Sequence, residues 1–394
     1  MNTTDLISLY IHIPFCRIKC SYCDFNTYAG LDTLMPSYVD AICNEIRYYQ
    51  GSENIEIGTI FFGGGTPSLL PTEFLVRILA AIKDTFVLDS DLELSLESNP
   101  GTLTSAYLDS LLKLGFNRIS IGAQSAVSSE LQILDRLHTF NRVIQSYKAA
   151  LSAGFQLINL DLMYGLPNQS ESSWKHTLSQ IVDLKAQHLS LYALSLENGT
   201  PMLDRVRSGA VPLPDPDITA NMFEHADTFL QSHNYTQYEI SSWSTTSNYS
   251  ECRHNLQYWR NLPYIGIGAG AHSWYKQYRY TNTRSPYGYI TQLNSNTSSK
   301  DQNTNSPGTP AMINSNFIDK ITEMNETMML GLRLLTHGVS HNEFQRRFGI
   351  NLTNQFRATL TQLVSKGLIH NDNKGVRLTS PGRLLANRVF SEFV

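Results

Sequence analysis

Six short apolar segments alternate with amphipathic segments over the first half of the chain, and this alternation restricts the fold more than any other feature. The candidate strands are Leu9–Ile13, Thr59–Phe62, Leu92–Glu97, Arg118–Ile121, Leu157–Leu162 and Leu189–Leu194. The candidate helices between them are Tyr38–Tyr49, Glu73–Phe86, Ser105–Leu114, Asn141–Ala153 and Ser172–Leu184. Alternating strands and helices form parallel sheets, because each helix crosses from the end of one strand to the start of the next. The sequence therefore predicts an α/β fold that is a partial (β/α)6 TIM-like barrel.

An unusual motif follows most of these strands. In chain order the motifs are the cysteine loop from Cys16, the turn Gly63-Gly64-Gly65-Thr66-Pro67, the segment Glu97-Ser98-Asn99-Pro100-Gly101, Gln124, and Asp161 with the turn that follows it. The carboxyl ends of parallel strands lie at one end of a barrel, where active sites form. We therefore expect the five motifs to meet at one site.

The cysteine loop reads CRIKCSYC, so that Cys16, Cys20 and Cys23 have the spacing C-x3-C-x2-C. Three thiolates this close together can hold a cubic [4Fe–4S] cluster by three of its irons and leave the fourth open to a ligand that is not protein. Such clusters usually take four cysteines, and no fourth cysteine is nearby. A zinc site completed by a histidine such as His12 remains an alternative, although paired C-x2-C motifs are more typical of zinc.

Several other residues at the strand ends are suited to binding a small ligand. The glycines of Gly63-Gly64-Gly65 allow a close backbone approach, but the turn lacks the Lys-Ser/Thr ending of a phosphate loop. Glu97 and Asp161 can accept hydrogen bonds from an amine or hydroxyl, Gln124 can donate and accept, and Arg136 can pair with a carboxylate. A solvated or helix-capping role is equally consistent with each residue alone. Their shared position favours a ligand site.

Two histidine-containing segments lie further along the chain. His254 begins HNLQYW, in which a histidine could ligate haem iron and the aromatic rings could stack on a porphyrin. A buried, hydrogen-bonded core histidine is the alternative. His272 lies in GIGAGAHSW, where the glycines again predict a close backbone approach. Near the cysteines, Tyr22 and Phe25 could shield a cluster from water or pack in the core.

The pattern changes after about residue 200. Residues 1–240 are predicted to form the barrel, and residues 241–293 are predicted to complete its active face. Residues 294–317 begin with an Asn- and Ser-rich run and are predicted to be a flexible linker. Residues 318–394 show helices followed by a hairpin, which predicts a C-terminal α+β module of winged-helix-like form.

Composition narrows the class of protein. The chain has 394 residues, of which 41% are hydrophobic and 16% charged, as in ordinary globular proteins. A net charge of −4 without a polybasic run argues against nucleic acid as a partner. The N-terminus is too short and polar for a signal peptide, and no apolar run of 18 residues predicts a membrane span. Five cysteines, three of them within eight residues, suit a reducing cytoplasm.

The chain also resembles a known family. CRIKCSYC resembles the signature of the radical S-adenosylmethionine (SAM) superfamily. FFGGGTPS, ESNPGT, RISIGAQS, NLDLMYGLP, HNLQYW and YIGIGAGAHS resemble the branch that contains oxygen-independent coproporphyrinogen oxidases and HemW-type haem chaperones. The resemblance implies that Cys16, Cys20 and Cys23 bind a [4Fe–4S] cluster whose open iron is chelated by SAM. It also implies an electron donor such as a flavodoxin or ferredoxin. The implied SAM contacts are Tyr10, Gly64, Gly65, Thr66, Glu97, Gln124, Arg136 and Asp161.

Two features divide this branch. The oxidases carry an extra cysteine two places after the third cluster cysteine, where this chain has Phe25, and they have a long N-terminal extension. This chain has neither feature, since only about eight residues precede its first predicted strand. Their absence, together with HNLQYW from His254, resembles the HemW type. The resemblance therefore implies a protein that binds haem and transfers it to an acceptor protein. Oxidative decarboxylation of coproporphyrinogen III is the first alternative, and a zinc-stabilised binding protein is the second.

Overall fold

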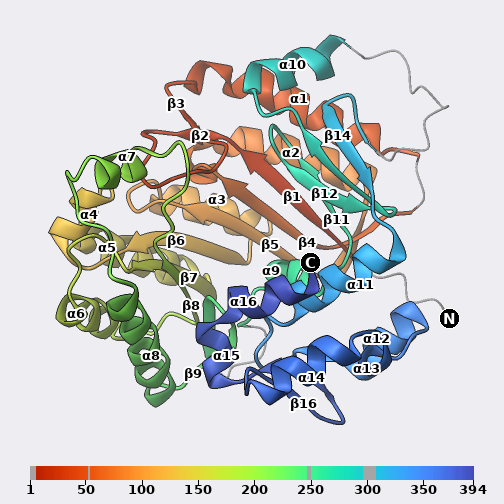
Figure 1. Cartoon of the computed structure of the whole chain (residues 1–394). Coiled ribbons are helices and arrows are strands. Elements are labelled where there is room, and N and C mark those ends of the chain that lie inside the picture. The colour runs from red at the N-terminus through yellow and green to blue at the C-terminus, as the bar shows by residue number, and fades with distance from the viewer. Residues whose placement is uncertain (1–5, 52–53, 246–249, 296–307) are drawn as a thin grey trace.

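One sheet of twelve strands, in the order β14-β13-β12-β11-β1-β4-β5-β6-β7-β8-β10-β9, forms the centre of the computed structural model (Figure 1). The structure describes residues 6–51, 54–245, 250–295 and 308–394. The strands from β11 to β8 run parallel. They comprise β11 (Tyr264–Ile267), β1 (Ile7–Ile13), β4 (Glu56–Gly64), β5 (Val87–Ser98), β6 (Arg118–Gln124), β7 (Leu157–Tyr164) and β8 (His188–Ala193). All six predicted strands are present, and the predicted α/β architecture is confirmed.

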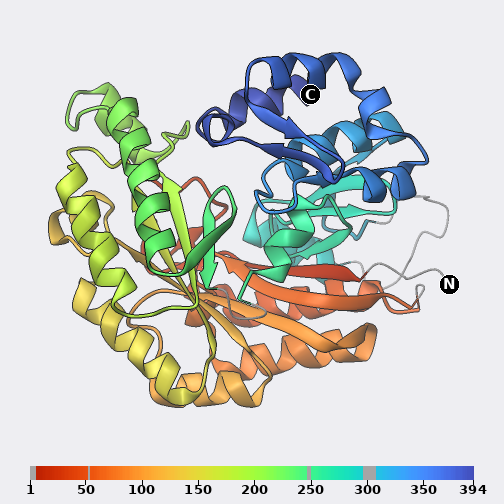
Figure 2. The same ribbon diagram turned by 90° about the horizontal axis from the view of Figure 1, so that it is seen from below.

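The crossover helices lie along the outer side of the curved sheet, as Figure 2 shows. They are α1 (Met35–Tyr48), α2 (Thr72–Thr85), α3 (Ser105–Lys113), α5 (Phe140–Ala153) and α6 (Glu171–Val182). Each matches a predicted helix to within a few residues at either end. Two further helices, α4 (Ser128–Ile133) and α7 (Pro201–Arg207), were not predicted, because segments this short show no clear helical period.

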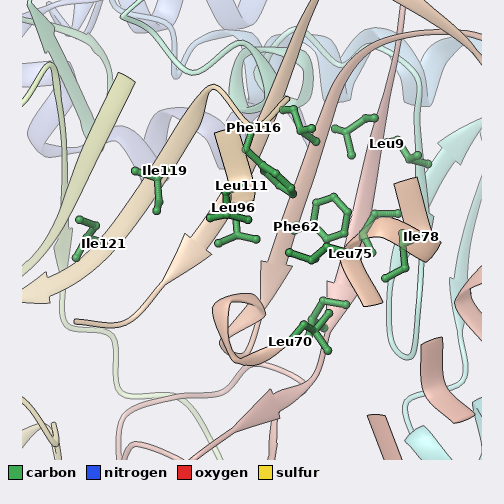
Figure 3. Packing of buried hydrophobic residues seen from close by; sticks show 14 of the residues in the cluster. Leu9, Phe62, Leu70, Leu75, Ile78, Leu96, Leu111, Phe116, Ile119 and Ile121 are labelled. Atoms are coloured by element: carbon green, nitrogen blue, oxygen red, sulfur yellow. The ribbon is translucent and has the colours of Figure 1, made fainter. Parts of the chain in front are cut away.

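Alternation along each parallel strand separates the core from the inner face of the sheet. In β5, Leu94 and Leu96 belong to the hydrophobic core, whereas Ser95 and Glu97 line a chamber on the opposite face. Figure 3 shows the core side of the sheet. The strands supply Leu9, Phe62, Leu96 and Ile119, and helices α2 and α3 supply Leu75, Ile78 and Leu111. Burying each such side chain contributes roughly 1.5–3 kcal/mol. The same alternation that builds the core therefore turns polar residues inward.

Antiparallel strands extend both edges of the sheet. Beyond β8 lie β10 (Ser242–Thr245) and β9 (Tyr235–Glu239), and α8 (Pro216–Ser232) precedes them. Beyond β11 lie β12 (His272–Tyr275), β13 (Tyr278–Asn282) and β14 (Met312–Phe317), and α10 (Pro286–Ser295) follows β13. Strand β10 lies in a polar stretch without a predicted strand, because its buried Ser242 and Ser244 hide the apolar alternation.

The predicted linker over residues 294–317 is wrong at its C-terminal end. Residues 312–317 form β14, which pairs with β13 at the edge of the sheet. Its sequence MINSNF is rich in Asn and Ser because most of this edge strand is exposed or half-buried. Residues 296–307, which the linker prediction also covered, lie outside the described residues. The boundaries of the other predicted domains stay predictions, although residues 241–293 supply strands to both edges of the same sheet.

The C-terminal module contains a small antiparallel sheet with helices, as predicted. Its strands are β15 (Val339–Ser340), β17 (Gly375–Leu378) and β16 (Ile369–Asn371), and its helices are α11 (Lys320–Gly331), α12 (His341–Phe348), α13 (Leu352–Gln355), α14 (Arg357–Ser365), α15 (Ser380–Leu384) and α16 (Ala386–Phe390). Phe344, Phe348 and Phe356 pack in its own core. Within the described ranges, no helix is long and apolar enough to cross a membrane.

A buried carboxylate on α1 connects that helix to the part of the sheet that contains β11 and β13. Glu45 is fully buried, and its oxygens accept hydrogen bonds from the Gly268 N–H at 2.8 Å and the Asn282 amide at 2.8 Å. The Tyr289 and Thr309 hydroxyls donate to the same carboxylate at 2.5 and 2.7 Å. Burial raises the pKa of Glu45, and these donors oppose that effect. Glu45 therefore holds the Gly-rich turn after β11 in place.

We expect Glu45→Ala to lower the free energy of unfolding by about 3 kcal/mol, because four buried donors lose their acceptor. Urea unfolding followed by circular dichroism measures this change. Glu73→Ala, on the exposed side of α2, is the matched control and should change stability by less than about 0.5 kcal/mol. Equal midpoints for the two variants would contradict the assigned role of Glu45.

Candidate functional site

The three cysteines lie on one loop beyond the carboxyl end of β1. Strand β2 (Phe15–Cys16) pairs in parallel with β3 (Tyr28–Ala29), and this pairing closes the base of the loop. The Cys23 N–H donates to the Cys20 carbonyl oxygen at 3.1 Å, which forms a turn between these two cysteines. All three cysteines are free and half-buried. Their thiols are therefore available to a ligand from the solvent side.

The chemistry of these thiols fits an iron–sulfur cluster. Burial raises the pKa of the Cys16 and Cys23 thiols, and nearby cysteine thiols raise it further. The mutual effect indicates that the sulfur atoms lie near one another. Across the described part of the chain, no three His, Cys, Asp or Glu side chains lie close enough to share a single metal ion. Neighbouring thiols on a partly open loop are the donor set that a [4Fe–4S] cluster takes.

His12 is not a free ligand for a zinc ion. Its Nε2 lies 2.9 Å from the Asn26 carbonyl oxygen, and its Nδ1 lies 3.0 Å from the Tyr10 hydroxyl. Because a carbonyl only accepts, Nε2 carries the proton and Nδ1 accepts from Tyr10. Burial lowers the pKa of His12 to about 4, so that the ring is neutral. Both nitrogens are used in tying β1 to the cysteine loop, which weakens the zinc alternative.

The glycine turn after β4 packs directly against the cysteine loop. A Cβ atom on Gly65 would lie 2.6 Å from the Phe15 carbonyl oxygen and 3.0 Å from the Cys16 sulfur. Gly64 has a φ of 112°, and a Cβ there would lie 2.5 Å from the His12 ring. The close backbone approach predicted from the glycines is present, but it is an approach to the chain's own cysteine loop. Larger residues at these positions would displace Cys16.

A line of hydrogen bonds connects Cys20 to Cys16 across the ends of the strands. Arg136 Nη1 lies 3.5 Å from the Cys20 sulfur, and Arg136 Nη2 donates to the Asn99 side-chain oxygen. The Asn99 amide donates to the Thr66 hydroxyl at 2.9 Å, and that hydroxyl donates to the Cys16 sulfur at 3.7 Å. Donors directed at sulfur favour its thiolate form. Asn99 was not a predicted site residue, although it lies in the motif directly after the third predicted strand.

A chamber of about 210 Å³ lies on the inner face of the sheet. Four of the predicted site residues meet there: Tyr10, Glu97, Asp161 and His254. Phe61, Tyr192 and Tyr258 add aromatic walls, and Ser120, Asn159 and His188 add polar groups. The strand-end residues that the sequence predicted to converge therefore do so in part, with His254 brought in from a much later segment.

The chamber holds two carboxyl groups with raised pKa values. Burial and then the neighbouring Asp161 raise the pKa of Glu97 to about 7, although the Gly64 N–H donates to Glu97 at 3.0 Å. Burial also raises the pKa of Asp161, against hydrogen bonds from Ser120 at 2.6 Å and Asn159 at 2.8 Å. A ligand that brings a positive charge or several donors would relieve this unfavourable burial.

Gln124 and Arg136 lie together at the end of β6. Gln124 has a φ of 65°, a backbone angle that residues other than glycine seldom adopt. The pairing of β6 with β7 is also irregular at this point. A Cβ atom on Gly122 would lie 2.9 Å from the Gln124 amide nitrogen and 3.1 Å from Arg136 Nη2. The irregular strand end and Gly122 therefore place the two predicted side chains side by side.

A second cavity, of about 290 Å³, lies beside Cys20. Two of the predicted residues, Thr66 and Arg136, line it together with Asn99. Arg17, His138 and Arg142 also line this cavity, and so do apolar side chains such as Ile18 and Leu69. The cysteine loop is thus flanked by a cavity that is lined by three arginines, Arg17, Arg136 and Arg142.

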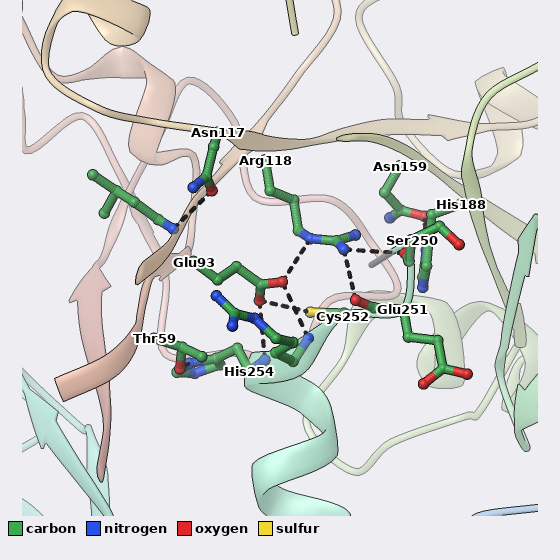
Figure 4. A network of polar contacts seen from close by, with 12 residues as sticks. Thr59, Glu93, Asn117, Arg118, Asn159, His188, Ser250, Glu251, Cys252 and His254 are labelled. Atoms are coloured by element: carbon green, nitrogen blue, oxygen red, sulfur yellow. Dashed lines mark hydrogen bonds and ion pairs between the residues drawn. The ribbon is translucent and has the colours of Figure 1, made fainter. Parts of the chain in front are cut away.

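Arg118, which lines the chamber, forms a buried ion pair with Glu93, as Figure 4 shows. Arg118 Nε lies 3.1 Å from Glu93, and both side chains are almost fully buried. The same carboxylate accepts the backbone N–H groups of Arg253 and His254, at 3.1 and 3.0 Å, at the start of α9 (Arg253–Trp259). Arg118 also donates to the Glu251 carbonyl oxygen at 2.7 Å. Neither Arg118 nor Glu93 was a predicted site residue, although Glu93 lies on the same face of β5 as Glu97.

His254 is 1% exposed and has both ring nitrogens occupied. Nδ1 lies 2.7 Å from the Thr59 hydroxyl, and Nε2 lies 2.8 Å from the Tyr258 hydroxyl. Burial lowers the pKa of His254 to about 3, so that the ring is neutral. The role of His254 as an iron ligand stays a prediction. Coordination at this residue would require one of these two hydrogen bonds to break.

Phe25 does not pack in the core. Its side chain is 64% exposed, and the Lys19 ammonium donates to its carbonyl oxygen at 3.4 Å. The core-packing alternative for Phe25 is therefore wrong. Tyr22 is half-buried and packs against a small cluster formed by Leu134, Met163, Leu166 and Met202.

Comparison with known proteins identifies the family. Residues 10–181 match the radical SAM superfamily, and residues 318–385 match the HemN C-terminal domain. Over 389 residues the chain is 36% identical to the heme chaperone HemW of Bacillus subtilis, covering 98% of this chain and 99% of the relative. The chain belongs to the HemW family of radical SAM proteins. This confirms the resemblance on which the expected function depends.

Other relatives extend the family. The chain is 38% identical over 296 residues to the heme chaperone HemW of Escherichia coli, covering 72% of this chain and 75% of that protein. It is 31% identical over 379 residues to the mitochondrial radical S-adenosyl methionine domain-containing protein 1 of Mus musculus, covering 95% and 84%.

A solved structure shares the fold. Coproporphyrinogen III oxidase (HemN) from E. coli, described as a radical SAM enzyme, aligns with a TM-score of 0.83 over 98% of this chain and 90% of that chain. The two sequences are 21% identical. At this identity the likeness establishes the architecture and leaves the activity to the residues of the site.

We expect Glu97→Gln to stabilise the cofactor-free protein at pH 8 and to have little effect at pH 4. The folded state raises the pKa of Glu97 from the usual 4.5 to about 7. The stability that the neutral carboxyl contributes is present below pH about 4.5 and is lost as pH rises through about 7. The gain at pH 8 should reach up to about 3 kcal/mol in urea unfolding, since one pKa unit is about 1.4 kcal/mol. Equal effects at both pH values would contradict a buried, titrating Glu97.

Proposed function

We propose that this protein binds haem and passes it to an acceptor protein, on a scaffold that holds a [4Fe–4S] cluster and SAM. The observation that carries the proposal is the near full-length identity of 36% to a protein named heme chaperone HemW. Phe25 supports it, because the oxidase branch has a further cysteine at this position. The exposed Phe25 side chain offers an apolar surface next to the cysteine loop where the oxidases offer a thiol.

In this proposal Cys16, Cys20 and Cys23 hold the cluster. A cluster held by three cysteines supplies one-electron chemistry and one iron that is open to the amino and carboxylate groups of SAM. Thr66 and Arg136 would stabilise the thiolates through their contacts with Cys16 and Cys20. The positive charge of Arg136 also offsets part of the negative charge that three thiolates bring.

The chamber is the proposed site for the rest of SAM. Glu97 and Asp161 would accept hydrogen bonds from its amine and hydroxyl groups, which favours the charged form of both carboxyls. Gln124, Gly64, Gly65 and Tyr10 would position it. The buried Arg118–Glu93 pair would hold the chamber wall in place, because Glu93 is engaged both with Arg118 and with the start of α9.

The proposed partners follow from the surface near the cysteines. Arg17 and Arg142 are exposed beside the cavity at Cys20, and a protein with an acidic face would be attracted there. An electron donor such as a flavodoxin or ferredoxin fits this requirement. A cytoplasmic location is proposed from the five unpaired cysteines, which suit a reducing compartment. The haem acceptor is proposed only as a protein.

We expect Cys20→Ser to lose the cluster. After anaerobic reconstitution, the wild type should contain iron and acid-labile sulfide and should absorb broadly near about 400 nm. Cys20→Ser should lose most of that absorbance. Cys43→Ala, in the core on α1, is the matched control and should retain it. Zinc without iron or sulfide in the wild type would support the zinc alternative instead.

We expect the reconstituted wild type to take up haem in a saturable way, with a shifted Soret band, and to release it to an apo-haem protein. Titration followed by absorbance measures the uptake, and gel filtration separates donor from acceptor. Bovine serum albumin in place of this protein controls for non-specific transfer. Absence of any uptake would refute the proposal. Conversion of coproporphyrinogen III with reductive cleavage of SAM would support the oxidase alternative.

A further inference from the structure

Histidine is a common protein ligand to haem iron, and it binds the iron through a ring nitrogen that is accessible and not otherwise engaged. The chain has 11 histidines. His254 and His12 are both buried, and both use their two ring nitrogens within the fold. An accessible neutral imidazole with one free nitrogen would meet the requirement without breaking a contact.

His272 has these properties. It is exposed, begins β12 and pairs with Thr281 of β13. Its Nδ1 lies 3.1 Å from the Thr281 hydroxyl, which fixes the ring, whereas its Nε2 makes no hydrogen bond to any residue that the structure describes. Partial burial, Arg279 and Arg284 lower the pKa of His272, which favours the neutral ring. The ring is therefore held in place through Nδ1, and the Nε2 lone pair could bind a metal ion.

An arginine side chain that has no partner among the described residues lies near His272. Arg284 is exposed and lies close enough to His272 to influence its ionisation. Its guanidinium makes no hydrogen bond or ion pair with any other described residue, in contrast to Arg279, which pairs with Glu326 at 2.6 Å. A guanidinium of this kind is suited to a carboxylate from a ligand.

Two solvent-exposed aromatic residues lie close in the chain to Asn26 and Arg284, which are joined by a hydrogen bond. The Asn26 amide donates to the carbonyl oxygens of Ala269 and Arg284, both at 2.9 Å, and so joins the cysteine loop to the Gly-rich turn before His272. Phe25 precedes Asn26 and is 64% exposed, and Tyr287 is 58% exposed at the start of α10. Rings with this exposure can cover an apolar, flat ligand.

We propose that His272 is an axial ligand to haem iron, on a surface formed by Phe25, His272, Arg284 and Tyr287. This inference rests on the proposed function and names its binding site. The imidazole would bind iron, the aromatic rings would contact the porphyrin, and Arg284 would pair with a propionate. Asn26 connects this surface to the cysteine loop through its hydrogen bond to Ala269. The surface residues do not line the chamber that contains His254.

Close contacts join the backbone segments that carry this surface. A Cβ atom on Gly270 would lie 2.5 Å from the Asn26 amide, and the Gly270 N–H donates to the Thr283 carbonyl oxygen at 2.8 Å. The Tyr38 hydroxyl donates to the His12 carbonyl oxygen and accepts from the Ala269 N–H. These contacts connect the cysteine loop, the turn before His272 and α1, so that the backbone segments carrying the four side chains are held together.

Haem titration of His272→Ala tests the inference. We expect binding that is at least about tenfold weaker than in the wild type, together with a Soret band of a protein that has lost a nitrogen ligand. Added imidazole should restore the wild-type spectrum, which a folding defect would prevent. His370→Ala, an exposed strand histidine in the C-terminal module, is the matched control and should bind as the wild type does.

A second variant tests the propionate contact. Arg284→Ala should weaken haem binding several-fold, and it should bind haem and haem dimethyl ester equally, whereas the wild type should prefer the free acid. Wild-type binding and an unchanged spectrum in His272→Ala would overturn the inference while leaving the proposed function intact, and loss only in His254→Ala would assign the ligand to the chamber. No binding by the wild type would overturn the proposed function itself.

Discussion

The ion pair between Glu93 and Arg118 connects the parts of this structure that the site depends on. Arg118 Nε on β6 lies 3.1 Å from a carboxylate oxygen of Glu93 on the adjacent strand β5, and both side chains are almost fully buried. Removing one partner of such a pair typically costs about 3–5 kcal/mol, because the other charge stays buried without compensation. Glu93 also accepts the first N–H groups of α9. The sheet, the chamber wall and the HNLQYW helix therefore share one carboxylate.

Helix α9 carries this connection to the C-terminal module. The Arg333 guanidinium lies 4.2 Å from the centre of the Trp259 ring at the end of α9. Arg347 donates to the Asn261 carbonyl oxygen at 2.6 Å, just beyond the helix. One short helix thus contacts the chamber through His254 and the module through Trp259. His254, Tyr258 and Trp259 of the HNLQYW motif therefore have structural contacts that do not depend on iron binding.

Sequence patterns were sufficient for the framework of the fold and for the position of the site. Period-2 strands and period-3.6 helices are local signals, so β1 and β4 to β8 could be predicted, whereas β14 could not because an exposed edge strand needs no apolar alternation. Glu97 and Asp161 were predictable from their position at strand ends. Asn99, Glu93 and Arg118 were not, since their partners lie far away in the sequence and only the folded chain brings them together.

The fold shared with coproporphyrinogen oxidase means that a few side chains must separate the two functions. Under the proposed function the chamber residues Glu97 and Asp161 would contact SAM, which both functions require, so they would not discriminate. Residues at the outer edge of the cysteine loop can, because that edge decides what approaches the site from solvent. Here that edge offers Phe25, an exposed apolar ring, and its neighbour Asn26 binds the turn before His272, whose Nε2 bonds no described residue. A surface of this chemistry is suited to a flat, iron-containing ligand that must also leave, since an exposed site releases its ligand without opening the chamber.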